Sequence, residues 1–331
     1  LKPPSSMLPY YSPLARRMER ALAAVALLLS AFCADALRKS QKDGPDIYLL
    51  SFGAGDGFDI SEQRLADEAR STGLFDKVVS YRSFPDFIKN DRRWAEHMQH
   101  KTGNGFWFWK APLAKQLMSE VMKDGDLLVY LDGGSELGNM SEFREVTRRL
   151  CDHDILAYAL KWTEQQLTKG DVFKRFNMSV SDAVGPQLLA TYYVIKNNKA
   201  SRSFVAKWES LAADLRLIGD STSSVPNHAS FYAHRRDQSL FSMLVKANKP
   251  AVEEGLSQSF PRALRERRHE EFGVQDFRPF IARDPGYPQN PQRHWISASR
   301  IKGKSKPRFG DGPTHLSKEE VDSMKRLLTT C

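Results

Sequence analysis

The chain has 331 residues, of which 41% are hydrophobic and 27% are charged, and this globular composition excludes wholesale disorder. Its three cysteines are too few for a disulfide-rich scaffold or a multi-cysteine zinc site. The net charge is +9, and residues 259–331 alone contain 15 basic and nine acidic residues. The positive region suits an anionic ligand, an anionic surface or simple solubility.

The N-terminal region combines the three parts of a secretory signal. Three arginines between positions 16 and 20 precede an apolar stretch at 21–32, and the small residues at 34–36 form a cleavage pattern. We therefore expect residues 1–36 to be a signal peptide or an N-terminal membrane anchor. The apolar stretch is shorter than the roughly 18 residues of a confident membrane span, and a short buried helix is the alternative.

A location in the secretory pathway follows from this interpretation. We expect the protein in the Golgi or the ER lumen, either secreted or held as a type II membrane protein, with residues 37–45 as a polar linker. Two Asn-x-Ser sequons, at Asn139 and Asn177, fit a glycoprotein. Whether Cys151 pairs with Cys331 is open on the sequence alone.

The first elements of the chain predict an α/β domain. Residues 46–52 form an apolar run that stops at the glycine-rich stretch 53–57, a pattern typical of a buried strand and a turn. Residues 61–72 have a helical apolar face, and residues 77–81 are a second strand. The order strand, loop, helix, strand begins a mostly parallel sheet flanked by helices.

The rest of the chain continues this alternation up to about residue 278. Further helices are predicted at 112–123, 141–150, 203–215 and 237–247, and further strands at 127–131, 155–160 and 190–195. We expect a single domain over residues 46–278. Residues 279–331 are rich in Pro, Gly, Arg and Lys, which predicts a basic, largely irregular extension with a final helix near 317–328.

The first candidate site follows the most apolar strand. Residues 127–131 run directly into Asp132, Gly133 and Gly134, and Glu136 supplies a second carboxylate. Ligands of open α/β sheets bind beyond the carboxyl ends of strands, and carboxylate oxygens suit Mg²⁺ or Mn²⁺. The alternative is an Asp-Gly turn that only ends the strand.

The second candidate is an aromatic segment, residues 103–112, that leads into a helix. Lys110 near the helix start is placed to contact phosphate, and Trp107 with its aromatic neighbours can stack on a base or a sugar. The alternative is a core role, and we expect at least two of the four rings to be buried.

The third candidate precedes the helix at 237–247. His234, Arg235 and Arg236 stand just before Asp237 and Gln238, a combination that suits anions and sugar hydroxyls. The alternative is a solvated basic turn in which Asp237 caps its own helix.

A polar loop that contains Lys169 follows the strand at 155–160. Residues 162–173 are either an acceptor-side loop or an ordinary connection between elements.

Taken in this order, the segments resemble the GT-A type of nucleotide-sugar-dependent glycosyltransferase, in a poorly characterised group. Its motifs are Gly-x-Gly-aromatic-Trp-x-Trp-Lys-Pro, Leu-Asp-x-Gly, Thr-Lys-x-Asp-x-Phe and Arg-x-Asp-Gln-Ser. They occur here at residues 103–110, 131–134, 168–173 and 235–239. The resemblance covers roughly residues 47–244 and implies a Rossmann-like GT-A fold.

The resemblance implies transfer of a sugar from a nucleoside diphosphate to a glycan or glycoprotein acceptor, with no nucleic acid involved. Asp132 would hold Mn²⁺ or Mg²⁺ on the diphosphate. Two positions depart from the motifs, because Gly134 replaces the second acid of the usual Asp-x-Asp and Ala111 stands where Pro is expected. Glu136 or a later histidine would then supply the missing metal ligand.

The residue chemistry and the resemblance together predict three sets of site residues. The catalytic set is Asp237 and Gln238, and the metal set is Asp132 and Glu136. The donor-binding set is Gly53, Asp56, Trp107, Lys110, Gly134, Lys169, His234 and Arg235.

Two other functions compete with this one. The incomplete acidic motif suits a secreted carbohydrate-binding pseudoenzyme of the same fold that does not catalyse transfer. The basic stretch 300–308 suits nucleic-acid binding, but the secretory signal places the chain in a compartment without nucleic acid.

Overall fold

The computed structural model describes residues 44–182, 185–260, 269–284, 296–297 and 312–330. The chain divides into two units at residue 43, and the account below concerns the second unit. The expected signal or anchor at 1–36, most of the linker at 37–45 and the basic stretch 300–308 lie outside the described residues. No helix in the described part of the chain is long and apolar enough to cross a membrane.

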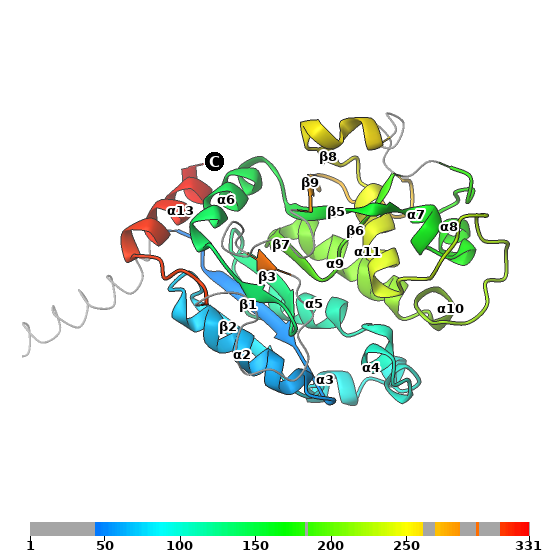
Figure 1. Ribbon diagram of the computed structural model, residues 1–331, viewed down its shortest axis with the longest axis horizontal. Coiled ribbons are helices and arrows are strands. Elements are labelled where there is room, and N and C mark those ends of the chain that lie inside the picture. Colours follow the sequence, from blue (N-terminus) through cyan, green and yellow to red (C-terminus); the bar gives the residue numbers. More distant parts are fainter. Residues whose placement is uncertain (1–43, 183–184, 261–268, 285–295, 298–311, 331) are drawn as a thin grey trace, which may run out of the picture. The chain divides into compact units, whose positions relative to one another are not determined.

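An eight-stranded mixed sheet forms the centre of the domain (Figure 1). Its order is β2-β1-β3-β7-β5-β9-β8, with β6 paired to β5. The β1–β2, β1–β3, β5–β9 and β8–β9 pairs are parallel, whereas β7 runs antiparallel to β3 and β5, as β6 does to β5. The strands are β1 (Ile47–Phe52), β2 (Lys77–Tyr81), β3 (Leu127–Asp132), β5 (Ile155–Thr163), β6 (Pro186–Leu188), β7 (Tyr192–Lys196), β8 (Ala251–Val252) and β9 (Pro279–Arg283). The expected α/β class with a mostly parallel sheet is confirmed.

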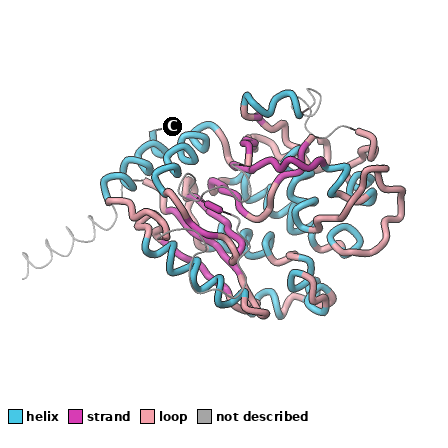
Figure 2. The backbone as a smooth tube through the Cα atoms, in the orientation of Figure 1, coloured by secondary structure: helices cyan, strands magenta, loops and turns pink. Residues whose placement is uncertain are grey.

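Helices cover both faces of the sheet, which Figure 2 shows as cyan segments around the magenta strands. The longer helices are α2 (Phe58–Ser71), α5 (Lys110–Glu120), α6 (Phe143–Asp152), α9 (Lys199–Ala212), α11 (Asp237–Lys246) and α13 (Lys318–Thr330). The shorter elements are α3 (Asp86–Lys89), α4 (Gly103–Phe106), α7 (Glu164–Leu167), α8 (Gly170–Arg175), α10 (Leu215–Ile218), and the 3₁₀ turns Arg92–Trp94, His97–Gln99, Met140–Glu142 and Glu254–Ser259. A separate ribbon pairs β4 (Glu136–Leu137) with β10 (Ile296–Ser297).

The side chains of β1 alternate between the two faces of the sheet, and each face is covered by its own layer of helices. Every residue of this strand is buried, as expected where helices cover both faces of a sheet. Tyr48 and Leu50 belong to the core that contains side chains of α5, α9 and α11. Ile47 and Leu49 belong to the core that contains side chains of α2, α6 and α13. Successive side chains of a strand point to opposite faces, so one short apolar run anchors both layers.

The sheet extends past residue 278, where we expected the regular structure to end. Residues 279–283 form β9, which lies beside β5 with Phe280 opposite Leu156 and Ile281 opposite Ala157. The expectation of irregular chain is wrong here because proline is tolerated as the first residue of a strand and because Phe280 and Ile281 are buried.

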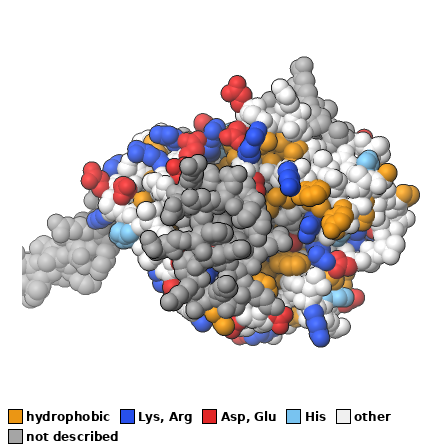
Figure 3. All heavy atoms as spheres, in the orientation of Figure 1, with side chains coloured by type: hydrophobic (Ala, Val, Ile, Leu, Met, Phe, Trp, Pro, Cys, Tyr) orange, Lys and Arg blue, Asp and Glu red, His pale blue; other side chains and the backbone are white. Residues whose placement is uncertain are grey.

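The final helix is found close to where it was expected. α13 begins at Lys318, and Val321 and Met324 enter the core beside α6. Figure 3 shows acidic and basic side chains interspersed over the region of α6 and α13. Cys151 of α6 is disulfide-bonded. The pairing with Cys331 that the sequence left open involves a residue outside the described part.

Candidate functional site

The candidate site lies where β1 and β3 end. The two strands run in parallel with Phe52 beside Asp132, and β2 lies on the other side of β1. The strand that follows β1 in the chain lies on one side of it and β3 lies on the other, so the order of the strands reverses between β1 and β3. Ligands of open α/β sheets bind in the crevice beyond the carboxyl ends of the strands at such a reversal. The glycines that follow the two strands let α2 approach closely: a Cβ on Gly53 would lie 2.7 Å from the Cβ of Glu62, and one on Gly133 would lie 3.0 Å from the same atom.

Lys110 joins two carboxylates at this end of the sheet. Its Nζ lies 3.0 Å from Asp132 Oδ1 and 2.9 Å from Asp237 Oδ2, and it donates to the carbonyl oxygen of Ala190 at 2.9 Å. The hydroxyl of Tyr130 donates to Asp132 Oδ1 at 2.6 Å. The structure thus brings the predicted metal ligand and the predicted catalytic carboxylate into contact with one ammonium group.

Burial and charge act in opposite directions on this cluster. Burial alone would lower the pKa of Lys110, but the charges of Asp132 and Asp237 outweigh it and the pKa is raised above its ordinary value. Burial raises the pKa of Asp237 to about 6, against the opposing effect of Lys110. Burial, with Asp132 adding to it, also raises the pKa of Tyr130 well above its ordinary value, so this phenol remains a hydrogen-bond donor.

A left-handed turn delivers Lys110 to the site. All residues of 103–107 have positive φ, between 49° and 93°. This conformation costs an L-residue roughly 1–2 kcal/mol, and Phe106 and Trp107 adopt it although they are bulky. Gly103 is required, because a Cβ there would lie 2.2 Å from the ring of Trp107. Strain of this kind persists only where the surroundings hold it in place, and it gathers at functional sites.

Hydrogen bonds and ring packing hold the turn. Asn104 donates to the carbonyl of Ala54 at 3.0 Å, which ties the turn to the glycine-rich loop after β1. Trp109 donates to the carbonyl of Gly103 at 3.1 Å, and its ring centroid lies 4.1 Å from that of Phe52. The aromatic segment thus connects the end of β1 to the start of α5.

Three of the four rings of the aromatic segment are core residues. Phe106, Phe108 and Trp109 are buried, which confirms the expectation of at least two. Trp107 is partly exposed, and the guanidinium of Arg236 lies 5.6 Å from its ring centre. Trp107 therefore lies beside the residue that directly precedes Asp237.

The structure does not support the interpretation of Asp237 as a cap. Asp237 is the first residue of α11, 5% exposed, and directed at Lys110. Arg236 occupies the cap position with a φ of 53° and no capping side-chain bond. Its guanidinium pairs with Asp220 at 2.8 Å.

Gln238, which was expected in the catalytic set, is bonded to a backbone group and to a side chain within the protein. Its Oε1 accepts from the backbone N–H of Ala190 at 3.3 Å, and its Nε2 donates to Gln187 at 2.6 Å. Both ends of the amide are therefore engaged inside the protein. Gln238 holds the peptide at Ala190, whose carbonyl accepts from Lys110.

Lys169 and His234 are also engaged with backbone groups. Lys169 is 2% exposed and donates to the carbonyl oxygens of Gly219 and Ser221, at 2.9 and 3.3 Å. His234 Nε2 lies 2.8 Å from the carbonyl oxygen of Leu217. Burial, with the charge of Lys169 adding to it, lowers the pKa of His234 to about 3, so the imidazole is neutral near pH 7.

These two residues and Arg235 belong to a second cavity. All three line a hollow of about 650 Å³ whose other walls come from residues 220–236. Lys110, Asp132 and Asp237 are not among its lining residues. The predicted donor-binding set is thus divided between the end of the sheet and this loop cavity.

The two remaining predicted donor residues lie in the loops that follow β1 and β3. Asp56 is exposed, with a φ of 51°, just before α2. Gly134 is buried in the turn after Asp132. The structure thus places both beyond the carboxyl ends of these strands.

Glu136, the expected second metal ligand, is the first residue of β4, in the chain segment that follows Asp132. It is 1% exposed and lies near the Arg64–Glu68 pair of α2, where burial first, and the charge of Glu136 in addition, raise the pKa of Glu68. Across the described residues, no group of three His, Cys, Asp or Glu side chains is arranged to hold a metal.

Asp132 itself fits a divalent cation. Its Oδ1 contacts Lys110 and Tyr130, and within the described chain no group donates a hydrogen bond to its Oδ2. The side chain is 28% exposed. Magnesium is commonly bound through one or two carboxylates together with substrate phosphates, and Asp132 offers one such carboxylate.

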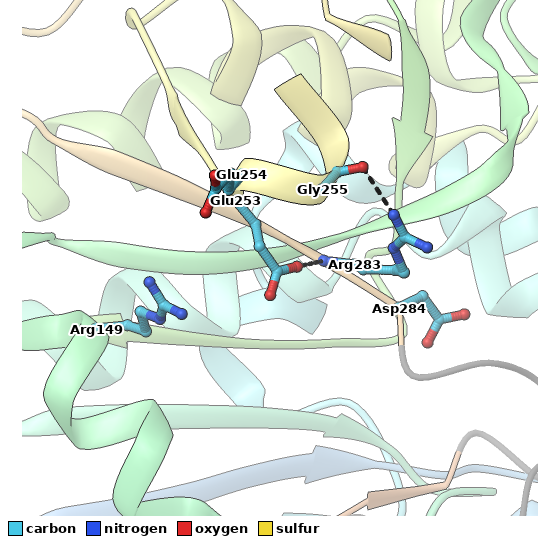
Figure 4. Close-up of a pocket in the computed structure, with 6 residues that line it drawn as sticks. All are labelled: Arg149, Glu253, Glu254, Gly255, Arg283 and Asp284. Carbon is cyan, nitrogen blue, oxygen red and sulfur yellow. Dashed lines mark hydrogen bonds between the residues drawn. The ribbon is translucent and has the colours of Figure 1, made fainter. Parts of the chain in front are cut away.

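A further hollow, of about 550 Å³, lies at the carboxyl end of β9 and is drawn in Figure 4. Arg283 donates through its backbone N–H to Glu253 at 2.7 Å and through its guanidinium to the carbonyl of Gly255 at 2.8 Å. Arg149 and Asp284 complete the wall. We assign this hollow no role.

The sequence reading missed Tyr130 and Arg236. Tyr130 stands two residues before Asp132, and side chains at this spacing in a strand share a face, so the pattern held a usable signal for the contact. Arg236 was noted only as one of several cations. Its unusual backbone and its position between Trp107 and Asp220 depend on contacts across the fold.

No family model matches the chain, and no curated protein matches it in sequence. Among solved structures, it is similar to a glycosyltransferase involved in glycosylation of the major capsid of PBCV-1, with 11% identity and a TM-score of 0.37, over 84% of this chain and 99% of that one. It is similar to the galactosyltransferase LgtC, solved with donor and acceptor sugar analogues, with 13% identity and a TM-score of 0.35, over 68% and 82%. It is also similar to mouse xyloside xylosyltransferase 1, with 13% identity and a TM-score of 0.33, over 66% and 92%.

Proposed function

We propose that this protein is a glycosyltransferase that moves a sugar from a nucleoside diphosphate donor to a glycan or glycoprotein acceptor. The observation that carries the proposal is the contact of Lys110 with both Asp132 and Asp237 at the carboxyl ends of the strands. This is where open α/β sheets bind nucleotides. The proposal also includes action within the secretory pathway, which rests on the N-terminal sequence pattern.

The donor diphosphate is assigned to the crevice beyond β1 and β3. Gly53 and Gly133 let α2 pack closely at this edge of the sheet, and the loop 53–57 would lie next to the nucleotide. With both carboxylates ionised, Lys110, Asp132 and Asp237 together carry one negative charge, which would repel a diphosphate. Mn²⁺ or Mg²⁺ held by Asp132 would reverse that repulsion and neutralise the leaving diphosphate.

The two carboxylates have different tasks because their surroundings differ. Asp132 is partly exposed and would face the diphosphate. Asp237 is buried, with a pKa of about 6, and is ionised at neutral pH. An ionised carboxylate at this point hydrogen-bonds sugar hydroxyls or stabilises positive charge as it develops at the anomeric carbon. Lys110 fixes both carboxylates relative to each other, as a preorganised site requires.

Gly134 favours one competing function. Gly134 stands where the second acid of Asp-x-Asp is expected, and that acid would bind metal. A carbohydrate-binding protein without transferase activity would lack this acid and keep the other residues of the site. Such a protein would bind glycans and leave nucleotide sugars intact, so turnover of the donor separates the two functions.

The test is a donor-hydrolysis screen of the purified protein across nucleotide sugars, with Mn²⁺ and with EDTA. We expect release of nucleoside diphosphate from one donor class, dependent on the metal. Asp132→Asn should abolish this release while the fold is kept. Asp67→Asn is the matched control, because Asp67 is exposed on α2 and pairs with Arg70. Equal rates for Asp132→Asn and wild type would reject the proposal.

A further inference from the structure

The loop cavity, which is lined by Lys169 and by residues between 220 and 236, has no role in the proposed donor site. Its volume of about 650 Å³ falls within the ordinary range for pockets that bind small ligands. Arg236 lines it, and the next residue in the chain is Asp237. The cavity is therefore connected to the cluster of Lys110, Asp132 and Asp237 through the peptide that joins Arg236 to Asp237.

The walls of the cavity are held by internal bonds. Lys169 binds the carbonyls of Gly219 and Ser221. Asn227 accepts from the backbone N–H of Gly170 at 2.7 Å, and Ser223 accepts from the N–H of Asp171 at 3.0 Å. These contacts fix the loop against α8, so the cavity is formed before any ligand arrives, which lowers the entropic cost of binding.

Other groups of the wall remain available to a ligand. Tyr232 is 77% exposed, and within the described residues its hydroxyl has no hydrogen-bond partner. Thr222 is exposed, and the Asp220–Arg236 ion pair is 44% and 24% exposed. An aromatic ring with a polar tip serves well where one side of a ligand is apolar and the other is wet. A sugar has this character, with C–H groups on a ring face and hydroxyls at its edge.

We propose that this cavity binds a sugar ring of the acceptor glycan, with Tyr232 as the stacking platform and the Asp220–Arg236 pair as the partner of its hydroxyls. This inference rests on the proposed function and names the acceptor side of the same site. A nucleotide base is the less suitable occupant, because the crevice of β1 and β3 receives the nucleotide. The position of Arg236 directly before Asp237 brings the acceptor to the transferring sugar.

The test uses the full chain on a printed array of neutral and acidic oligosaccharides, with parallel measurement of donor hydrolysis. Tyr232→Ala should lower glycan binding at least about tenfold and leave donor hydrolysis without acceptor unchanged. Thr222→Val is a second variant with the same expected direction. Trp162→Ala is the matched control, because Trp162 is an exposed aromatic, 44% accessible, that does not line the cavity.

Each result has a definite meaning. Loss of glycan binding in Tyr232→Ala with retention in Trp162→Ala supports the acceptor site. Unchanged binding in Tyr232→Ala and Thr222→Val overturns it, as does a wild-type protein that hydrolyses a donor but binds no glycan. Reduced affinity of Tyr232→Ala for UDP also overturns it, because the cavity would then belong to the donor. Glycan binding through Tyr232 without any donor hydrolysis would keep the site and reject the transferase.

Discussion

Two buried lysines of this protein make instructive partners for comparison. Lys246 of α11 is 1% exposed and contacts Glu164 Oε1 at 2.6 Å, and Glu164 is itself fully buried. The hydroxyl of Ser242 also donates to Oε1, and Thr168 donates to Oε2 at 2.5 Å. Every acceptor of this carboxylate is satisfied inside the protein.

The cluster around Lys110 differs because it is open at one end. Lys110 is as buried as Lys246, but Asp132 is 28% exposed. Burial lowers the pKa of Lys246 in spite of Glu164, whereas two carboxylates raise the pKa of Lys110. The sealed pair joins α7 to α11 and can only support structure. The open cluster keeps a charged oxygen at a crevice, where a ligand can use it.

The largest expected effects come from replacing each of the two lysines in turn, which tests whether only Lys110 is needed for activity. Lys110→Met leaves Asp132 and Asp237 facing each other without a cation. We expect donor hydrolysis per folded molecule to fall at least about 100-fold and the free energy of unfolding to fall by about 3–5 kcal/mol. Donor hydrolysis and urea unfolding measure the two effects.

Lys246→Met provides the contrast. This change should lower the free energy of unfolding by a similar amount, because Glu164 is left buried without its cation. Its hydrolysis rate per folded molecule should stay within about twofold of wild type. If the two variants lose the same activity per folded molecule, the distinction between an open and a sealed cluster fails.

The left-handed turn offers the next largest effect. Gly103→Ala places a Cβ against the ring of Trp107 and should shift the start of α5, with about 2–4 kcal/mol lost in stability and a marked fall in donor hydrolysis. Gly125→Ala is the control, because Gly125 has a φ of 93° but open space around it. It should cost only about 1 kcal/mol and spare the activity.

The raised pKa of Asp237 predicts how stability and activity depend on pH. The folded protein holds this proton more tightly than the unfolded chain, whose Asp titrates near 3.8. Its contribution to stability is therefore complete below pH 3.8 and lost as pH rises through about 6, by about 3 kcal/mol in total. The unfolding free energy of wild type minus that of Asp237→Asn should therefore fall by this amount as pH rises over the interval.

Activity should change with pH in the opposite sense. Donor hydrolysis requires ionised Asp237, so kcat/KM should fall about tenfold per pH unit below about 6. A pH profile of the wild-type protein measures this limb. A rate that stays flat between pH 5 and 7, both about a unit from the expected midpoint, would remove Asp237 from the mechanism.

The smallest expected effect concerns two stacked tyrosines. Their ring centroids are 5.0 Å apart, but only Tyr130 contacts Asp132. Tyr130→Phe should cost about 1 kcal/mol of stability and reduce donor hydrolysis several-fold. Within the described residues the buried hydroxyl of Tyr193 has no partner, so Tyr193→Phe should be neutral or stabilising. Equal effects of the two changes would contradict the assigned role of Tyr130.

The sequence predicted local features of this site better than long-range ones. The apolar run before Asp132 and the helix after Asp237 were found from periodicity alone, and the resemblance in motif order linked the two. The contact of Lys110 with both carboxylates was not predictable, because it depends on how β3, α5 and α11 meet. The placement of Glu136 against α2 was missed for the same reason, since proximity in sequence does not fix the direction of a side chain after a turn.

The most direct measurement is a crystal structure of the protein with UDP and Mn²⁺. The account predicts the diphosphate beyond the ends of β1 and β3, next to Gly53 and Gly133, with the cation on Asp132 and the loop cavity around Tyr232 left free. Diphosphate bound in the loop cavity, or a cation held by residues other than Asp132, would contradict the central claim.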